Sequence, residues 1–206
     1  MKIKVCGMRE AKNIAALTDL KPDYIGFIFY EKSPRHMNAD PVAVPEGIKK
    51  VGVFVDAPKG YVLQQIEAHE LNVVQLHGKE DQQYISLLRE LVHTDIDFWK
   101  VFSVGEKFDF KKLKPFEELV DAFLFDTRGA APGGNGKTFD WKLLNAYRSE
   151  LPIVISGGIG LDELPAVKEL LQTSLPIMAI DVNSKFESEP GLKKIDELKT
   201  LMNYEL

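Results

Sequence analysis

The chain contains a single cysteine, Cys6, and therefore cannot form an internal disulfide. It also lacks a cysteine and histidine cluster with the spacing of a zinc site, so we predict neither a bound metal nor a redox role. No apolar run approaches the ~18 residues of a membrane span, and the first residues lack the parts of a secretion signal. We therefore expect a cytoplasmic protein that does not bind membranes.

A block of lysine and arginine is also missing. The 26 basic and 31 acidic residues are spread along the chain and give a net charge of -5. No stretch is suited to neutralising a phosphate backbone, so nucleic acid is not an expected partner. No linker or low-complexity tract divides the sequence, and we predict a single domain over residues 1–206.

The sequence does contain about eight short apolar runs, at residues 3–7, 24–29, 50–55, 72–77, 98–104, 122–126, 152–158 and 176–182. Segments of helical periodicity, such as YVLQQIEAHE, QQYISLLREL and DWKLLNAYRSEL, lie between most of them. Strands that are apolar throughout are typical of a parallel sheet covered by helices. The number of units favours a closed (β/α)₈ barrel, or TIM barrel, over an open doubly wound sheet. Because the chain is short, we expect one or two abbreviated helices, first at 30–49 and then at 105–118.

In such a barrel the active site is built where the strands end. Two residues at strand ends are candidates for proton transfer, Cys6 and Asp126. A free cysteine is often only a small buried hydrophobe, but Gly7 allows a sharp turn that leaves the thiol at the barrel mouth, where cationic neighbours would favour the thiolate. Asp126 ends an apolar strand, where loss of solvent favours the neutral acid; the alternative is a helix cap or a loop salt bridge.

Three segments at the same rim are suited to binding an anion. They are a glycine-rich loop before a helix expected near Phe139, a glycine pair after the seventh strand and a turn after the eighth. Each glycine has a turn or cap as its alternative role. The candidate phosphate-binding residues are Gly134, Gly136, Lys137, Gly157, Gly158, Asp181, Asn183 and Ser184.

Other polar residues of the rim receive lesser roles. Arg35 follows a proline, and its planar fork suits a carboxylate, although a solvated surface arginine is the alternative. Gln75 and His77 are expected to line the pocket, since no recognisable triad motif includes His77.

Taken together, these segments resemble the phosphoribosylanthranilate isomerase family of tryptophan biosynthesis. The resemblance spans the chain in order: KVCGMRE, DYIGFIFYEKSPRHM, VGVFVD, VVQLHGKED, FDTRGAAPGGNGKTFDW, ISGGI and AIDVNSKFESEPGLKK. Two departures are SGGI where the family commonly has SGGL, and DVNS where it has DVSS. The second puts the individual phosphate contact of Asn183 in doubt.

The resemblance implies an Amadori rearrangement of N-(5-phosphoribosyl)anthranilate without a cofactor. By motif, Cys6 would be the general base, Asp126 the general acid and Arg35 the partner of the anthranilate carboxylate. The phosphate would rest on the GGNGK loop, Gly157-Gly158 and the DVNS turn. The family contains monomers and homodimers, and the sequence does not choose between them.

Other functions remain open at this stage. A metal-dependent epimerase would need clustered His and Asp ligands at the strand ends, and none is found. A relative of indole-glycerol-phosphate synthase would need a lysine inside the barrel, for which Lys4 is the one candidate. A non-catalytic barrel that binds a phosphate ligand is the alternative from another class.

Overall fold

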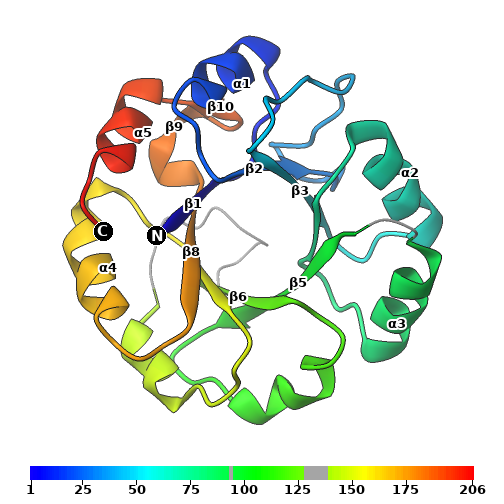
Figure 1. The fold of residues 1–206 in the computed structure, drawn as a ribbon, viewed down its shortest axis with the longest axis vertical. Coiled ribbons are helices and arrows are strands. Elements are labelled where there is room, and N and C mark those ends of the chain that lie inside the picture. Colours follow the sequence, from blue (N-terminus) through cyan, green and yellow to red (C-terminus); the bar gives the residue numbers. More distant parts are fainter. Residues whose placement is uncertain (93–94, 128–138) are drawn as a thin grey trace.

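The eight predicted strands form one closed parallel barrel. A computed structural model describes residues 1–92, 95–127 and 139–206 of the chain. The strands follow one another around the barrel in chain order, and the eighth pairs with the first (Figure 1). The strands are β1 (Lys2–Val5), β2 (Tyr24–Ile28), β3 (Lys49–Phe54), β4 (Val73–Leu76), β5 (Asp97–Val104), β6 (Ala122–Thr127), β7 (Ile153–Ser156) and β8 (Ile177–Val182). The closed barrel is confirmed and the open sheet is wrong.

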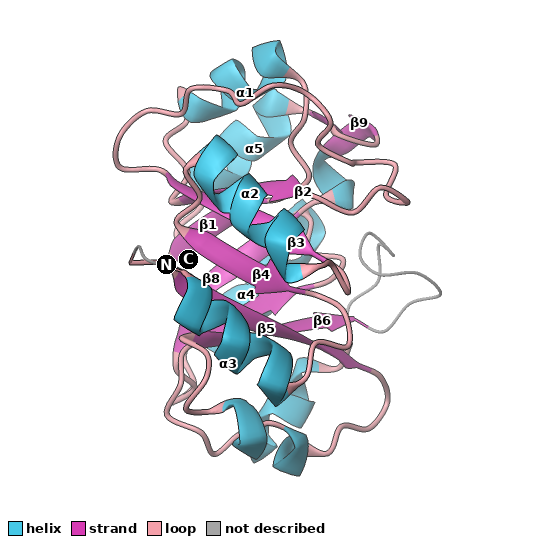
Figure 2. Ribbon diagram, turned by 90° about the vertical axis from the view of Figure 1, so that its right-hand side faces the viewer, coloured by secondary structure: helices cyan, strands magenta, loops and turns pink. Residues whose placement is uncertain are grey.

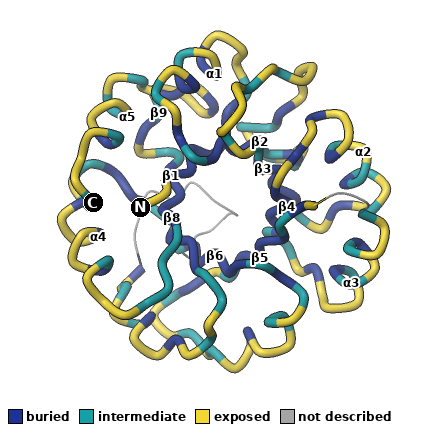
Figure 3. Tube along the Cα trace, in the orientation of Figure 1, coloured by how far each residue is buried: buried dark blue, intermediate teal, exposed yellow. Residues whose placement is uncertain are grey.

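Two layers of apolar side chains explain why the strands are apolar throughout. Alternate residues point into the barrel, where Tyr24 and Trp99 meet edge to face with their ring centroids 5.0 Å apart. The opposite strand faces pack against the surrounding helices. Figure 3 shows the resulting pattern, with buried strands inside a ring of helices whose outer sides are exposed.

The outer layer contains five α-helices in the described residues. Their amphipathic sequences place leucine and isoleucine against the barrel, as Ile85 and Leu88 do in α3. The helices are α1 (Ala11–Thr18), α2 (Lys59–His69), α3 (Gln82–Leu91), α4 (Leu164–Leu171) and α5 (Ile195–Met202). No described helix is both long enough and apolar enough to span a bilayer.

Three connections have no α-helix in their described parts. Residues 29–48 contain no helix, and the β5–β6 connection has only short 3₁₀ turns, at Phe110–Lys112 and Lys114–Phe116, as expected for the two abbreviated segments. The third was not expected, because the predicted helix in DWKLLNAYRSEL is a 3₁₀ segment at Trp141–Ala146. It ends where Tyr147 becomes extended and packs its ring against Phe110 and Phe125.

A small hairpin follows β8 and lies in the outer layer beside α1 and α5 (Figure 1). A 3₁₀ turn at Ser184–Phe186 leads into β9 (Glu187–Glu189), which pairs with β10 (Leu192–Lys193) in antiparallel fashion. Both chain ends lie at the other end of the barrel, where the strands begin (Figure 2). The connections that follow the strands are therefore free to form a site.

Candidate active site

A pocket open to solvent lies at the C-terminal ends of the strands. Most of the predicted site residues that the structure describes contribute to its wall. The lining is Cys6, Ile28, Tyr30, Ser33, Val53, Val55, Gln75, His77, Asp126, Ser156, Gly157, Gly158, Ile159, Asp181, Asn183, Ser184 and Lys185.

Cys6 lies one residue beyond β1 and is 4% exposed. Its backbone N–H donates to the carbonyl of Val182 at 2.9 Å, which continues the pairing of β1 with β8. Gly7 then turns the chain with φ +76, a conformation that favours glycine. As expected from this turn, the thiol reaches the pocket.

Asp126 lies near the end of β6 and is 5% exposed. Its Oδ1 accepts from the backbone N–H of Thr127 at 2.9 Å, and its Oδ2 lies 3.5 Å from Nε2 of His77. Among the described residues, Nε2 of His77 and Oε1 of Gln75 are buried without a hydrogen-bond partner. Unpaired buried polar atoms in a pocket wall are suited to a ligand.

The glycine pair after β7 has the backbone geometry expected of a tight turn. Gly157 has φ +94 and Gly158 has φ +67. A Cβ on Gly157 would lie 2.3 Å from Oγ1 of Thr127, so glycine is needed there for close packing as well as for its conformation. The turn role is therefore confirmed for Gly157, and its place in the pocket wall leaves its contact with a ligand as a prediction.

The segment after β8 also contributes Lys185, which we did not predict from the sequence. Ser184 and Lys185 both line the pocket beside the glycine pair. Asn183 lines the pocket as well, and its side-chain Oδ1 accepts from Nζ of Lys193 at 2.7 Å. The signal for Lys185 was its place next to Ser184 at the end of the last strand.

Asp181 does not fit the phosphate role that we expected for its side chain. Its Oδ1 accepts from Nζ of Lys4 at 2.9 Å, and its Oδ2 lies 3.4 Å from Oγ of Ser156. A carboxylate repels a phosphate, and this one already has a cationic partner. Three other predicted phosphate residues, Gly134, Gly136 and Lys137, lie outside the described residues.

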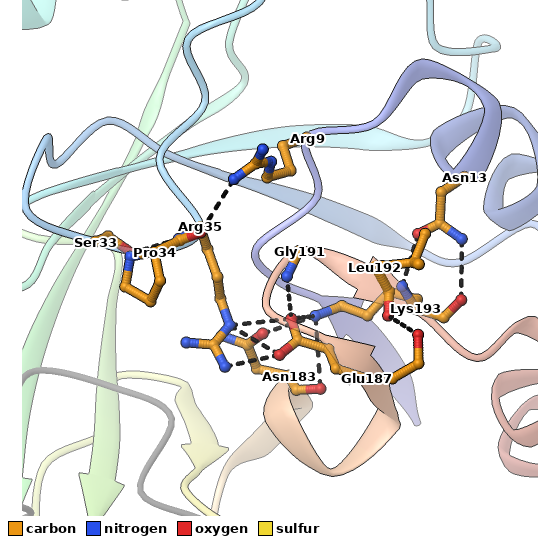
Figure 4. A network of polar contacts seen from close by, with 11 residues as sticks. Arg9, Asn13, Ser33, Pro34, Arg35, Asn183, Glu187, Gly191, Leu192 and Lys193 are labelled. Atoms are coloured by element: carbon orange, nitrogen blue, oxygen red, sulfur yellow. Dashed lines mark hydrogen bonds and ion pairs between the residues drawn. The ribbon is translucent and has the colours of Figure 1, made fainter.

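Arg35 lies beside the pocket but is not among the residues that line it. The sequence predicts that its guanidinium contacts a carboxylate of the substrate. Its Nε and Nη2 form a two-pronged ion pair with Glu187, at distances from 2.7 to 3.0 Å (Figure 4). Glu187 also accepts from Lys193, which is 3% exposed. Glu187 and Lys193 stand opposite each other in the β9–β10 pair and were missed in the sequence.

The charges near Cys6 only partly match the expectation of a stable thiolate. Burial raises the pKa of the Cys6 thiol above its ordinary value. The positive charges of Lys4 and, more weakly, Lys193 act in the opposite direction. The expected cationic neighbours are therefore present, but without a ligand the effect of burial on the pKa of Cys6 is larger than theirs.

Two buried lysines lie on barrel strands and have different surroundings. Lys4 points into the barrel beside Asp181, whereas Lys100 on β5 pairs with Glu80 at 2.9 Å and also donates to the carbonyl of Gly78. Of the two, only Lys4 was singled out from the sequence. Across the described ranges, no group of three or more His, Cys, Asp or Glu side chains is placed to hold a metal ion.

Comparisons with known proteins identify one family over nearly the whole chain. The family profile described as N-(5'phosphoribosyl)anthranilate (PRA) isomerase matches residues 3–204. The enzyme of that name from Parabacteroides distasonis is 40% identical over 208 residues, covering 98% of this chain and 92% of the relative.

Solved structures of the same family superpose on the barrel. Phosphoribosyl anthranilate isomerase from Thermotoga maritima has a TM-score of 0.82 and 28% identity, covering 98% of this chain and 97% of the other. A family structure in complex with reduced 1-(o-carboxyphenylamino)-1-deoxyribulose 5-phosphate has a TM-score of 0.80 and 27% identity, covering 98% and 96%. The match of sequence over nearly the whole chain, together with the shared closed barrel, shows that this protein belongs to the N-(5'-phosphoribosyl)anthranilate isomerase family.

Proposed function

We propose that the protein catalyses the Amadori rearrangement of N-(5-phosphoribosyl)anthranilate to 1-(2-carboxyphenylamino)-1-deoxyribulose 5-phosphate. Its family supports the reaction, and one observation supports the residues that perform it: a thiol and a carboxyl group, from β1 and β6, face the same pocket. We assign Cys6 as the general base and Asp126 as the general acid. The substrate and product are isomers, so the reaction needs no redox cofactor.

The reaction begins at the ring oxygen of the sugar. Asp126, in its neutral form, donates its proton to this oxygen as the bond from C1 to the ring oxygen breaks, and the nitrogen lone pair forms a C1–N double bond. Cys6, as a thiolate, then removes the proton from C2. The electrons of that bond form the C1–C2 double bond of an enolamine, and the nitrogen becomes neutral. Return of a proton to C1 and loss of one from the enol oxygen give the ketone.

Two neighbours are placed to support the acid. Thr127 N–H donates to Oδ1 of Asp126, which leaves Oδ2 for the transferable proton. Nε2 of His77 lies 3.5 Å from that oxygen and has no hydrogen-bond partner among the described residues, so the proton on Oδ2 stays available for the ring oxygen.

The phosphate group fits the side of the pocket formed after β7 and β8. Gly157 and Gly158 allow close approach of the backbone, and Ser184 and Lys185 add a hydroxyl and a positive charge. The Asn183 side chain is held by Lys193, so we assign Asn183 a backbone contribution only. The GGNGK segment remains a predicted partner of the phosphate.

The carboxylate of the anthranilate ring is assigned to Arg35. Glu187 occupies the Nε and Nη2 edge of the guanidinium (Figure 4), so we assign Nη1 to the carboxylate of the substrate. Glu187 thereby holds the fork in one orientation. Binding of the substrate then needs no rearrangement of the buried ion pair.

The assignment of acid and base is tested by following the loss of fluorescence of the aminoaldose substrate with purified protein. Cys6→Ser and Asp126→Asn should each lower kcat by about 100-fold or more with little change in KM, since both act in the transition state. Asp140→Asn, at an exposed aspartate, is the control. Near-normal turnover in either site variant would remove that residue from the mechanism, and ligand binding without turnover in the unaltered protein would favour a non-catalytic binding barrel.

The number of subunits stays a prediction between monomer and homodimer. The relative from Thermotoga maritima is named as dimeric in one solved structure. The described surface exposes two neighbouring apolar side chains on α3, Leu87 and Leu91. Light scattering of the purified protein would decide between the two states.

A further inference from the structure

Lys4 lies at the centre of the barrel with no exposed surface, and the proposed reaction does not yet use it. It stands on β1 two residues before Cys6, so the two side chains point to the same inner side of the strand. Its partner across the β1–β8 ladder is Asp181, and the two side chains meet at 2.9 Å. An ammonium group therefore lies one layer below the thiol.

A glycine on the neighbouring strand leaves room for this approach. A Cβ on Gly26 of β2 would lie 2.9 Å from Sγ of Cys6 and 3.2 Å from Nζ of Lys4. The thiol and the ammonium thus border the same point in space. Val51, Val73 and Val154 show that inner barrel positions readily take apolar residues, so a charged side chain here is not required for packing.

The charge of Lys4 is retained despite burial. Burial alone would lower the pKa of Lys4, but Asp181 and Cys6 outweigh it and hold that pKa above its ordinary value. A buried ammonium with one carboxylate partner has little hydration to lose when a second anion forms beside it. The ammonium is therefore available to the thiolate at neutral pH.

The wider set of charges also favours an anion at Cys6. With all five side chains ionised, Lys4, Lys193 and Arg35 bring three positive charges, Asp181 and Glu187 bring two negative ones, and a thiolate balances the set. Burial opposes this state, because it lowers the pKa of Lys193 and raises the pKa of Asp181. Of these groups, Lys4 has the largest effect in lowering the pKa of Cys6, Asp181 raises it and Lys193 lowers it more weakly.

Two further titratable groups face this cluster from β4 and β6. Burial raises the pKa of Asp181 and Lys4 lowers it, and smaller effects come from Asp126, which raises it, and from His77, which lowers it.

We propose that Lys4 is a positioning residue that stabilises the thiolate of Cys6 and so allows this buried thiol to serve as a base. The proposal rests on the base role given to Cys6 above. The thiol loses its proton to water before the reaction, the thiolate takes the C2 proton, and Lys4 keeps its own protons throughout. Asp181 holds the ammonium in place both when Cys6 is a thiol and when it is a thiolate.

Alkylation of Cys6 by iodoacetamide tests this without measuring turnover, and the label is unambiguous because the chain has one cysteine. Lys4→Gln removes the charge and keeps a donor for Asp181. Loss of a cation this close to a thiol raises the pKa of the thiol by about one to three units. Since a more basic thiolate is also more nucleophilic, we expect alkylation near neutral pH to slow by about 3- to 60-fold. Lys100→Gln, at the buried lysine paired with Glu80, is the matched control and should react as the unaltered protein.

A second variant predicts the opposite sign and guards against a Lys4 variant that does not fold. Asp181→Asn removes the negative charge that raises the pKa of Cys6 and leaves the thiolate as the anion next to Lys4. The fraction of thiolate should therefore rise, and alkylation should become faster. Far-ultraviolet circular dichroism selects the folded variants. Equal rates in Lys4→Gln and Lys100→Gln, or slower alkylation in Asp181→Asn, would overturn the proposal.

The role of Cys6 as the base and the effect of Lys4 on Cys6 can be refuted separately. If Lys4→Gln slows alkylation but Cys6→Ser keeps its turnover, Lys4 tunes the thiol and the thiol is not the base. If Cys6→Ser loses turnover and Lys4→Gln alkylates normally, Cys6 is the base and Lys4 does not act on it.

Discussion

At the scale of single residues, Arg35 shows how one side chain serves a buried ion pair and an incoming ligand. Its guanidinium has two edges, and Glu187 uses one of them. Glu187 in turn has Lys193 as a second cation, so the carboxylate is strongly held: although burial opposes it, Arg35 and Lys193 keep the pKa of Glu187 below its usual value. Arg35 is therefore fixed in direction before any substrate arrives.

Arg35→Ala should weaken substrate binding more than turnover. A charged hydrogen bond contributes about 1.5–3 kcal/mol, so we expect KM to rise by about 10- to 100-fold while kcat changes little. Steady-state kinetics on the fluorescent aminoaldose measures both quantities. Arg9→Ala is a suitable control, because Arg9 donates to the carbonyl of Pro34 beside Arg35 but is more exposed and has no ion pair with Glu187 in the described structure. An unchanged KM in Arg35→Ala would reject the carboxylate assignment.

At the scale of elements, the β9–β10 hairpin is held to the barrel by buried polar contacts. Lys193 reaches Glu187 and the side chain of Asn183, and its backbone N–H donates to Oδ1 of Asn13 on α1 at 2.8 Å (Figure 4). The hairpin thereby ties the end of β8 to the first helix. We expect its stability to depend on Lys193 more than on its two short strands.

Two adjacent lysines allow a direct test of that dependence. Lys193→Met leaves Glu187 with one cation fewer in a buried site, and breaking such a pair costs about 3–5 kcal/mol. Lys194 pairs with Glu197 at 3.0 Å, but both side chains are about two-fifths exposed, so Lys194→Met should cost less than about 1 kcal/mol. Urea unfolding of both variants gives the two free energies. Equal losses would mean that the buried network does not hold the hairpin.

The barrel strands and the buried ion pairs show what the sequence could and could not predict. The eight strands follow from their apolar runs, because burial on both faces leaves a local pattern. The pairing of Arg35 with Glu187 joins residues 152 positions apart, and that of Lys4 with Asp181 joins residues 177 apart. Such contacts depend on the closure of the barrel and leave no local pattern. A partial signal existed at Lys4, since alternation along β1 places it on the same side as Cys6.

The missed 3₁₀ segment has a different cause. The periodicity of DWKLLNAYRSEL is helical, and Asp140 caps the first turn by accepting from the N–H of Lys142 at 3.0 Å. The segment nevertheless ends at Tyr147, whose hydroxyl donates to the carbonyl of Leu151 at 2.7 Å. Tertiary packing of one aromatic ring outweighs local helix propensity here.

At the scale of the whole molecule, two buried tyrosines in the outer layer make the stability of the fold depend on pH in the alkaline range. Tyr84 on α3 donates to the carbonyl of Ala57 at 2.7 Å, and Tyr147 makes the comparable bond to Leu151. Burial raises the pKa of each to about 12. In the unfolded chain both would titrate near pH 10. Between these values the folded protein keeps protons that the unfolded chain loses, so stability is full below about pH 10 and falls as the pH rises toward 12.

Replacement of these tyrosines should therefore flatten the alkaline loss of stability. We expect the free energy of unfolding to fall between about pH 9 and pH 11, and Tyr84→Phe and Tyr147→Phe each to reduce that fall by about 1 kcal/mol or less, allowing for solvent screening. Urea unfolding at the two pH values measures the difference, which is independent of the cost of losing the hydroxyl itself. Tyr204→Phe, at a tyrosine that is 37% exposed, is the control and should leave the fall unchanged. If all three variants show the same fall, other groups cause the alkaline unfolding. Cys6, whose pKa burial also raises, would then be the first to examine, through the same measurement on Cys6→Ser.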